Sequence, residues 1–271
     1  MKKNSKLSLL SIVLLIALAG MAGLYAYQFL SRGQGAAATQ AGMSTPVSDE
    51  FGSRVRAYLL QNPEVIREVI TALQLKEAQE AAAQKTALLD AMRPDLEQDG
   101  YSYVAGNPNG DVTVVEFFDY RCGYCKKSFP DVMKLVKDDG NIRLVLKEFP
   151  VLGDPSMLAA QAAMAALKQE GKYMDFHVAL METRAQLSED RVFAIAEETG
   201  LNIEQLKADM KDDDIQENLS KTYQQARALG ISGTPTFIIG SELAPGAIPI
   251  AQMKALVDTA REKNKTAAAK N

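Results

Sequence analysis

Apolar residues recur at helical spacing between residues 49 and 98, ahead of any strand-like segment. A second helix is predicted to start after Asn62, which can cap it, with Pro63 in its first position. This helix is expected to run to about Met92, where Pro94 would stop it. The pattern therefore predicts a helical arm over 49–98, whose apolar stripe must pack against its own main domain or against other copies of the chain.

From Val112 the pattern changes to that of a βαβ unit. The run Val112–Phe118 is β-branched and aromatic, which is typical of a buried strand. An amphipathic helix follows and ends near Gly140, and Ile142–Phe149 has the pattern of a second strand. We expect the two strands to be parallel, with a right-handed crossover between them.

The segment over 153–228 is almost entirely helical in pattern. Strand character returns over Ile231–Ile239, followed by a short hairpin strand and a last amphipathic helix over Pro249–Lys263. The order is thus βαβ, a helical block, then ββα. This order predicts an α/β domain over residues 99–271, with the helical block inserted at one end of its sheet.

The N-terminal segment is an uncharged apolar run over 7–30, preceded by Lys2, Lys3 and Lys6. A basic start before an apolar segment is typical of an export signal, and this run is also long enough to span a bilayer. Residues 1–30 are therefore interpreted as a cleaved signal peptide or as an uncleaved membrane anchor. Both interpretations place the rest of the chain outside the cytoplasm, after a flexible linker over 31–48.

Composition narrows the classes of function. The chain has 271 residues, of which 47% are hydrophobic and 24% charged, as is usual for a protein with a packed core. The net charge is −4 and no long basic block is present, so nucleic acid is not an expected partner. With two cysteines and one histidine, the chain offers too few ligands for a zinc site, and no metal or other cofactor is expected. We expect His177 to be a packed or surface residue.

Cys122 and Cys125 lie two residues apart, between a predicted strand and a predicted helix. Thiolate is the nucleophile in disulfide exchange, and a helix N-terminus stabilises thiolate. Cys122, at the helix start, is the expected attacking thiol, and Cys125, one turn later, the resolving thiol. A purely structural disulfide across so short a loop would stabilise the fold little. The pair therefore predicts thiol–disulfide exchange.

Three segments together resemble a known family: residues 115–118 (VEFF), 122–125 (CGYC) and 233–237 (GTPTF). They are similar to the DsbA-like bacterial periplasmic thiol:disulfide oxidoreductases. The arm resembles that of the ScsC and Com1-type subgroup, whose members oligomerise through it. The resemblance implies a thioredoxin fold with an inserted helical domain, preceded by an N-terminal helical arm. It also implies a periplasmic homo-oligomer, dimer or trimer, assembled through residues 49–98.

The resemblance further implies roles for residues around the cysteines. Thr234 and Pro235 match a loop whose proline is cis and lies beside the nucleophilic sulfur, where a substrate peptide can pair as an added strand. Gly123 and Tyr124, between the cysteines, would also contact substrate.

Glu116 matches a buried acid beneath the active site of the family, and it stands out as a charge inside an apolar strand. Buried, it should have a raised pKa and exchange protons with Cys125. Lys147, in the second strand, is either the charge partner of Glu116 or an ordinary strand-end charge.

The direction of the reaction stays open. Strongly oxidising relatives usually carry Pro-His between the cysteines, whereas this chain has Gly123-Tyr124. An oxidase and a disulfide isomerase are both compatible with that dipeptide. The expected partners are exported proteins with cysteines and a membrane redox partner that recharges the pair. The alternative is a non-enzymatic periplasmic chaperone or metal-stress binding protein, in which the cysteines are secondary.

Overall fold

The computed structural model describes residues 49–269. The expected signal or anchor and the linker, residues 1–48, lie outside this range. Among the described residues, no helix is long and apolar enough to cross a membrane. The described chain falls into two units, one ending at Gln74 and the other beginning at Leu75.

The predicted arm is helical, as α2 (Asp49–Gln61) and α3 (Glu64–Glu97). Asn62 differs from the expected cap: its side-chain amide donates to the Tyr58 carbonyl at 2.9 Å, so it closes α2 instead of starting α3. The prediction that Pro94 stops the helix is wrong, because the helix continues through Pro94 to Glu97. Proline removes one backbone hydrogen bond, but Leu96, 2% exposed, is packed in the domain core and holds the last turn.

The first unit, residues 49–74, leaves much of its apolar surface uncovered within the chain. A shallow apolar hollow between α2 and the start of α3 is lined in part by Val55, Leu59 and Ile66. The large apolar side chains exposed in this unit are Phe51, Val55, Tyr58, Leu60, Ile66, Val69, Ile70 and Leu73.

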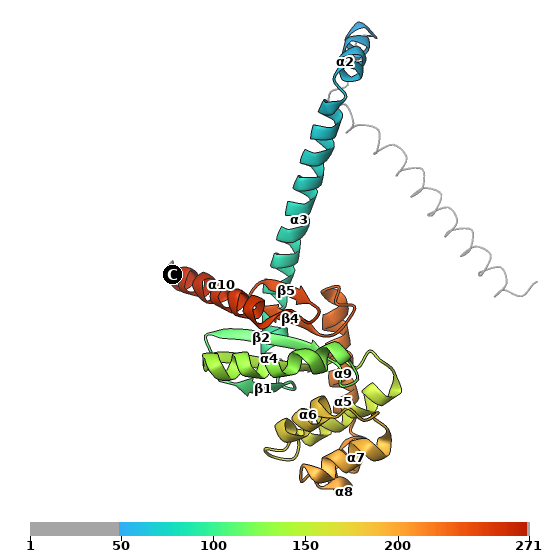
Figure 1. Ribbon diagram of the computed structural model, residues 1–271, viewed down its shortest axis with the longest axis vertical. Coiled ribbons are helices and arrows are strands. Elements are labelled where there is room, and N and C mark those ends of the chain that lie inside the picture. The colour runs from blue at the N-terminus through green and yellow to red at the C-terminus, as the bar shows by residue number, and fades with distance from the viewer. Residues whose placement is uncertain (1–48, 270–271) are drawn as a thin grey trace, which may run out of the picture. The chain divides into compact units, whose positions relative to one another are not determined.

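The second unit is built on a five-stranded sheet with the order β1-β3-β2-β4-β5 (Figure 1). β2 and β3 are parallel, as predicted, and the remaining neighbours are antiparallel. The edge strand β1 was not predicted, since its four residues are mostly half-buried and give a weak pattern. The strands are β1 (Tyr103–Gly106), β2 (Val112–Phe118), β3 (Ile142–Glu148), β4 (Thr236–Ile239) and β5 (Glu242–Pro245).

Helices cover both faces of the sheet. α4 (Gly123–Asp139) and α10 (Ile250–Ala268) pack on the face that carries Val114 and Phe118 of β2. The opposite face, with Val115 and Phe117, packs against the end of α3 and against α9 (Asp213–Ala228). Successive strand residues alternate between faces, so Glu116 lies on the α4 side of the sheet.

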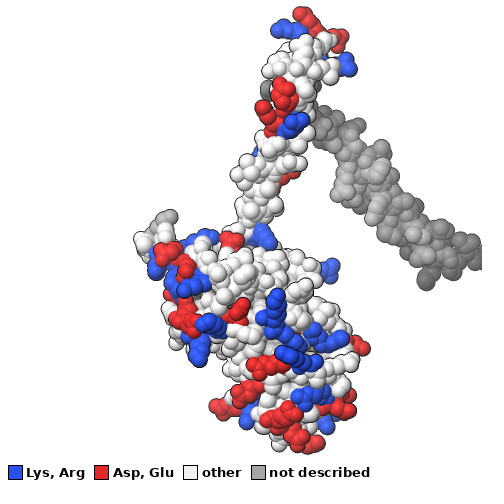
Figure 2. Space-filling view, viewed as in Figure 1, with Lys and Arg blue, Asp and Glu red and all other residues white. Residues whose placement is uncertain are grey.

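A helical block lies between β3 and α9 and packs against α4 and the sheet through α6 (Figure 1). On the face seen in Figure 2, acidic side chains predominate at the end of the block that carries α7 and α8, with a few basic ones among them. The block consists of α5 (Asp154–Ala166), α6 (Tyr173–Glu182), α7 (Glu189–Glu198) and α8 (Ile203–Asp209).

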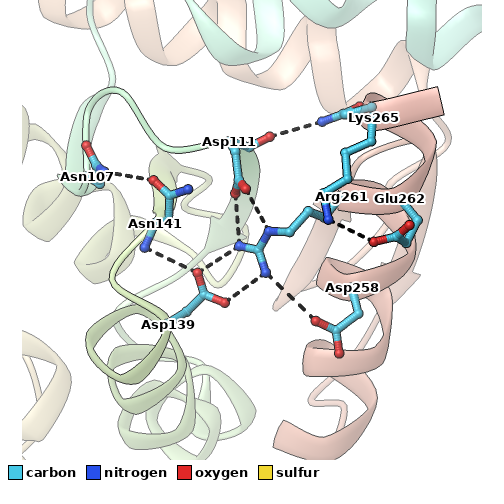
Figure 3. A network of polar contacts seen from close by, with 9 residues as sticks. Asn107, Asp111, Asp139, Asn141, Asp258, Arg261, Glu262 and Lys265 are labelled. Atoms are coloured by element: carbon cyan, nitrogen blue, oxygen red, sulfur yellow. Dashed lines mark hydrogen bonds and ion pairs between the residues drawn. The ribbon is translucent and has the colours of Figure 1, made fainter. Parts of the chain in front are cut away.

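Arg261 of α10 joins the C-terminal helix to two other elements (Figure 3). Its guanidinium donates to Asp111, just before β2, at 2.8 and 2.9 Å. It also donates to Asp139, at the end of α4, at 2.8 and 3.2 Å. Bidentate arginine–carboxylate pairs fix geometry as well as charge, so this cluster holds α10 against the start of β2, the end far from the cysteines.

Candidate active site

The two cysteines lie where β2 passes into α4, as predicted. Cys122 is the N-cap of α4, with extended backbone (φ −72°, ψ 113°), and its Sγ accepts a hydrogen bond from the Cys125 N–H at 3.3 Å. Both cysteines are free thiols. The unpaired amides of a helix N-terminus carry partial positive charge, and Cys122 is placed to receive it.

The pKa of Cys122 is lowered to about 6, first by the hydrogen bond from the Cys125 side chain. Partial burial opposes this shift, while the Thr234 side chain and the amides of Cys125 and Tyr124 add to it. When protonated, Cys122 can donate to the Thr234 carbonyl, 3.1 Å from its Sγ, which favours the thiol. The net result is a Cys122 that is mostly thiolate at neutral pH.

Cys125 has the opposite character. It is 0% exposed, and burial, followed by its hydrogen bond to Cys122, raises its pKa. One thiol is therefore charged and the other neutral over the same pH range. This asymmetry agrees with an attacking Cys122 and a resolving Cys125.

The Thr234–Pro235 peptide bond is cis, as the resemblance implies. The bond immediately precedes β4, and its Thr234 carbonyl is the group in contact with the Cys122 sulfur. Tyr124 is 67% exposed, and a side chain at Gly123 would meet open space. Of the predicted substrate residues, Thr234 thus contacts the Cys122 sulfur, and Tyr124 is exposed two positions after Cys122.

Glu116 lies within β2, between Leu146 of β3 and Phe237 of β4, and is 2% exposed. Its pKa is raised to about 8, mainly by burial and secondly by the negative charge of Cys122. Glu116 is therefore largely protonated at neutral pH, and close to the pH at which it can both give and take a proton.

The hypothesis that Lys147 is the charge partner of Glu116 is wrong. In the parallel register Lys147 lies opposite Phe117, so its side chain points to the other face of the sheet. There it forms an ion pair with Asp99 and donates to the Asp95 carbonyl at 3.3 Å. Burial lowers the pKa of Lys147, and the Asp99 carboxylate opposes this effect.

Asp119 is a site residue that the sequence analysis missed. It is 0% exposed, and its carboxylate accepts hydrogen bonds from the Arg121 amide at 2.7 Å, the Leu152 amide at 3.0 Å and the Ser156 hydroxyl at 2.8 Å. Asp119 therefore fixes the turn before Cys122 and joins it to the start of α5. An Asp directly after a strand is a common turn signal, which could have identified it.

Lys126 follows Cys125 on α4. Its ammonium donates to the carbonyls of Leu180, Met181 and Thr183, at 2.6, 3.2 and 3.0 Å. Lys126 thus supplies a hydrogen-bond donor to carbonyls at the C-terminal end of α6, where helix carbonyls have no partner in the next turn.

Among residues 49–269, no group of three or more His, Cys, Asp and Glu side chains could hold a metal ion. His177 is packed, 1% exposed, and burial lowers its pKa to about 3.

Comparison with known proteins assigns the chain to a family. A family model described as thioredoxin matches residues 98–259. The chain belongs to the thioredoxin family. A second model, described as the N-terminal domain of the copper resistance protein ScsC, matches residues 49–80. Within the family, the chain is thus a DsbA-like, ScsC-type protein.

Solved structures agree with this assignment. A thioredoxin-like oxidoreductase from Silicibacter pomeroyi is 45% identical, with a TM-score of 0.61, and the match covers 63% of this chain and 98% of that one. ScsC of Proteus mirabilis in a compact conformation is 29% identical, with a TM-score of 0.61, covering 80% of this chain and 99% of that one. The second match covers more of this chain than the first.

Two curated relatives are each 30% identical over part of the chain. The probable disulfide bond formation protein D of Bacillus cereus is 30% identical over 151 residues, covering 51% of this chain and 70% of that protein. The Na(+)/H(+) antiporter NhaA 1 of Salinispora arenicola is 30% identical over 176 residues, or 64% of this chain. This ScsC-type chain spans only 26% of the length of that antiporter.

Proposed function

We propose that this protein catalyses thiol–disulfide exchange on exported proteins through Cys122 and Cys125. The observation that carries the proposal is the asymmetry of the two thiols. Cys122 has a pKa of about 6, so it supplies a thiolate at neutral pH, while Cys125 is buried and protonated until it is needed. A thiolate beside a protected second thiol is what disulfide exchange requires.

In the reductive direction, the Cys122 thiolate attacks one sulfur of a substrate disulfide, and the other substrate sulfur leaves as a thiolate. Cys125 then loses its proton and attacks Cys122 Sγ. The Cys122–Cys125 disulfide forms, and the second substrate thiolate is released, so two electrons pass to the substrate. The oxidative direction is the reverse sequence, and isomerisation uses the first step followed by attack of another substrate thiol.

Glu116 acts in this scheme as the group that exchanges a proton with Cys125. Its pKa of about 8 is near neutral pH, so either protonation state is accessible. The backbone at Thr234 and Pro235, which follows the exposed Gly233, pairs with the substrate peptide beside the nucleophile, with Gly123 and Tyr124 next to it.

Whether the protein acts as an oxidase or as an isomerase depends on the reduction potential of the Cys122–Cys125 pair. A Cys122 pKa of about 6 lies between roughly 3.5 for DsbA and about 7 for thioredoxin. Stabilising the thiolate favours the reduced form of the pair. We therefore propose a reduction potential between those of DsbA and thioredoxin, which makes the pair less oxidising than that of DsbA. If the pair is mostly reduced in cells, the protein is an isomerase. If it is mostly oxidised by a membrane partner, the protein is an oxidase.

Export is proposed from the basic and apolar segment over 1–30. A periplasmic location follows for the rest of the chain, either soluble after cleavage or tethered to the inner membrane by residues 7–30.

Cys125→Ser is expected to trap substrates. The variant keeps the Cys122 nucleophile but cannot resolve the mixed disulfide, so covalent adducts with exported proteins should accumulate. The measurement is non-reducing electrophoresis of acid-quenched cells, with and without reductant. The double variant Cys122→Ser, Cys125→Ser is the matched control and should form none. If the double variant forms the same adducts, or Cys125→Ser forms none, exchange through Cys122 is wrong.

We also propose that the arm joins copies of the chain, as a dimer or trimer. Ile70 is 50% exposed within the chain, and the apolar residues around it in the first unit are similarly uncovered. Ile70→Asp should therefore lower the mass per particle in sedimentation, because it places a charge in an apolar interface. Thr71→Asp, at an exposed position on the side of α3 away from the apolar residues, is the control and should leave the mass unchanged. An unchanged mass for Ile70→Asp would show that this face is not the interface.

A further inference from the structure

Another buried acid, Glu148, lies beside the active-site turn and has no part in the scheme above. It ends β3, opposite Phe118 of β2, and is 3% exposed. Its Oε1 accepts hydrogen bonds from the hydroxyls of Tyr120 at 2.8 Å and Tyr173 at 2.9 Å. Its Oε2 is buried without a hydrogen-bond partner among the described residues.

Tyr120 connects this acid to the turn that carries the nucleophile. It stands two positions before Cys122 and is 1% exposed. Its hydroxyl lies 2.8 Å from Glu148 Oε1 and 2.9 Å from His177 Nδ1. A phenol donates one proton and accepts others, so both contacts can be satisfied together.

An aromatic cluster holds His177 in place. The His177 ring lies 4.9 Å from the ring of Phe118 and 5.5 Å from that of Phe129, between centroids. It stacks on Tyr173 at 5.6 Å, and Tyr173 stacks in turn on Tyr103 of β1 at 4.4 Å. The Tyr120 hydroxyl is therefore held between Glu148 of β3 and His177 of α6.

The surroundings of Glu148 favour its neutral form. The titratable groups that face it are Asp119 and Tyr120 from the turn, and Tyr173 and His177 from α6, with Tyr103 behind Tyr173. None is a cation, since burial keeps His177 neutral. A carboxylate with one bare buried oxygen would be strongly disfavoured there. Burial raises the pKa of Glu148 to about 8, even though the hydroxyls of Tyr120 and Tyr173 oppose the shift.

We infer that Tyr120, held between Glu148 and His177, is a positioning residue that sets the reactivity of Cys122. The inference rests on the proposed function of Cys122 as nucleophile. The Cys122 N–H donates to the Asp119 carbonyl at 3.0 Å, so the turn and the cysteine move together. Any shift of this turn changes the contacts of Cys122 Sγ with the Cys125 amide at 3.3 Å and the Thr234 carbonyl at 3.1 Å.

The first test compares Tyr120→Phe with Tyr173→Phe in the reduced full chain. The pH dependence of Cys122 alkylation by iodoacetamide gives its pKa without any substrate protein. Tyr120→Phe is expected to raise that pKa by about half a unit, which slows alkylation below the pKa about threefold. Tyr173→Phe removes a hydrogen bond to the same oxygen, but from a helix that carries no cysteine, and should titrate like the parent protein. An unchanged Cys122 titration in Tyr120→Phe, or an equal shift in both variants, overturns the inference.

The second test is Glu148→Gln, which keeps the shape and an acceptor oxygen but cannot ionise. It should leave the Cys122 titration unchanged. The folded protein keeps the Glu148 proton up to about pH 8, whereas an unfolded Glu loses it near pH 4.3, so stability falls as pH rises between these values. Glu148→Gln should remove part of that fall in urea titrations at pH 5 and pH 8. If Glu148→Gln shifts the Cys122 pKa as much as Tyr120→Phe does, the neutral-acid role is overturned.

If Tyr120→Phe shifts the Cys122 pKa but Cys125→Ser traps no substrate, the proposed function fails and the positioning role stands.

Discussion

Cys122→Ser should abolish insulin reduction, leaving only the uncatalysed background. A serine hydroxyl is protonated at neutral pH and forms no disulfide, so the first step of exchange cannot occur. The fold should survive, because the substitution replaces one small side chain by another at the N-cap of α4, where serine is a favoured residue.

The loss should be specific to the sulfur. Lys127→Ser, at an exposed position one turn further along α4, is the matched control and should retain most of the activity. Thermal unfolding of both variants checks that the fold is intact. Insulin reduction that persists in Cys122→Ser would exclude Cys122 as the nucleophile.

Glu116→Gln should produce the second large effect, and its sign depends on pH. The folded protein holds the Glu116 proton up to about pH 8, while an unfolded Glu releases it near pH 4.3. The parent protein therefore becomes less stable as pH rises through this window, by up to about 1.4 kcal/mol per pH unit for this one group. Glutamine has no proton to lose, so the variant should be nearly equal to the parent at pH 5 and more stable at pH 8.

The same variant should slow resolution. Without a proton acceptor for Cys125, release of the mixed disulfide is expected to fall by roughly 100-fold, the lower end of what a general base contributes. Cys122 alkylation at neutral pH is the internal control, since Glu116 is mostly neutral there and should affect that step little. Urea unfolding at both pH values and stopped-flow kinetics of release give the two measurements. Unchanged release kinetics would remove Glu116 from the mechanism.

Local patterns were enough to predict the strand–cysteine–helix junction. The apolar run of β2 and the amphipathic face of α4 are both encoded within a few residues of Cys122, so the nucleophile could be placed from sequence. The cis bond at Pro235 followed only from the resemblance, because no local pattern distinguishes it from an ordinary turn.

Features that depend on tertiary contacts could not be predicted from the local sequence pattern. Lys147 was linked to Glu116 because both are charges in apolar strands, but only the register of β2 against β3 shows that they face opposite ways. Pro94 follows the usual rule for a helix end, and burial of Leu96 overrides it. His177 was expected to be packed or at the surface, and its contact with Tyr120 joins residues 57 positions apart.

The Arg261 cluster has a consequence for the order of assembly. Its guanidinium reaches Asp111 across 150 positions of sequence and Asp139 across 122. Contacts this distant in sequence close late, because the chain entropy between them is lost before the contact stabilises anything. A chain that emerges from its N-terminus exposes both aspartates long before their arginine arrives. The contacts of Arg261 therefore form only after α10 has been synthesised, when the last helix is held against the start of β2.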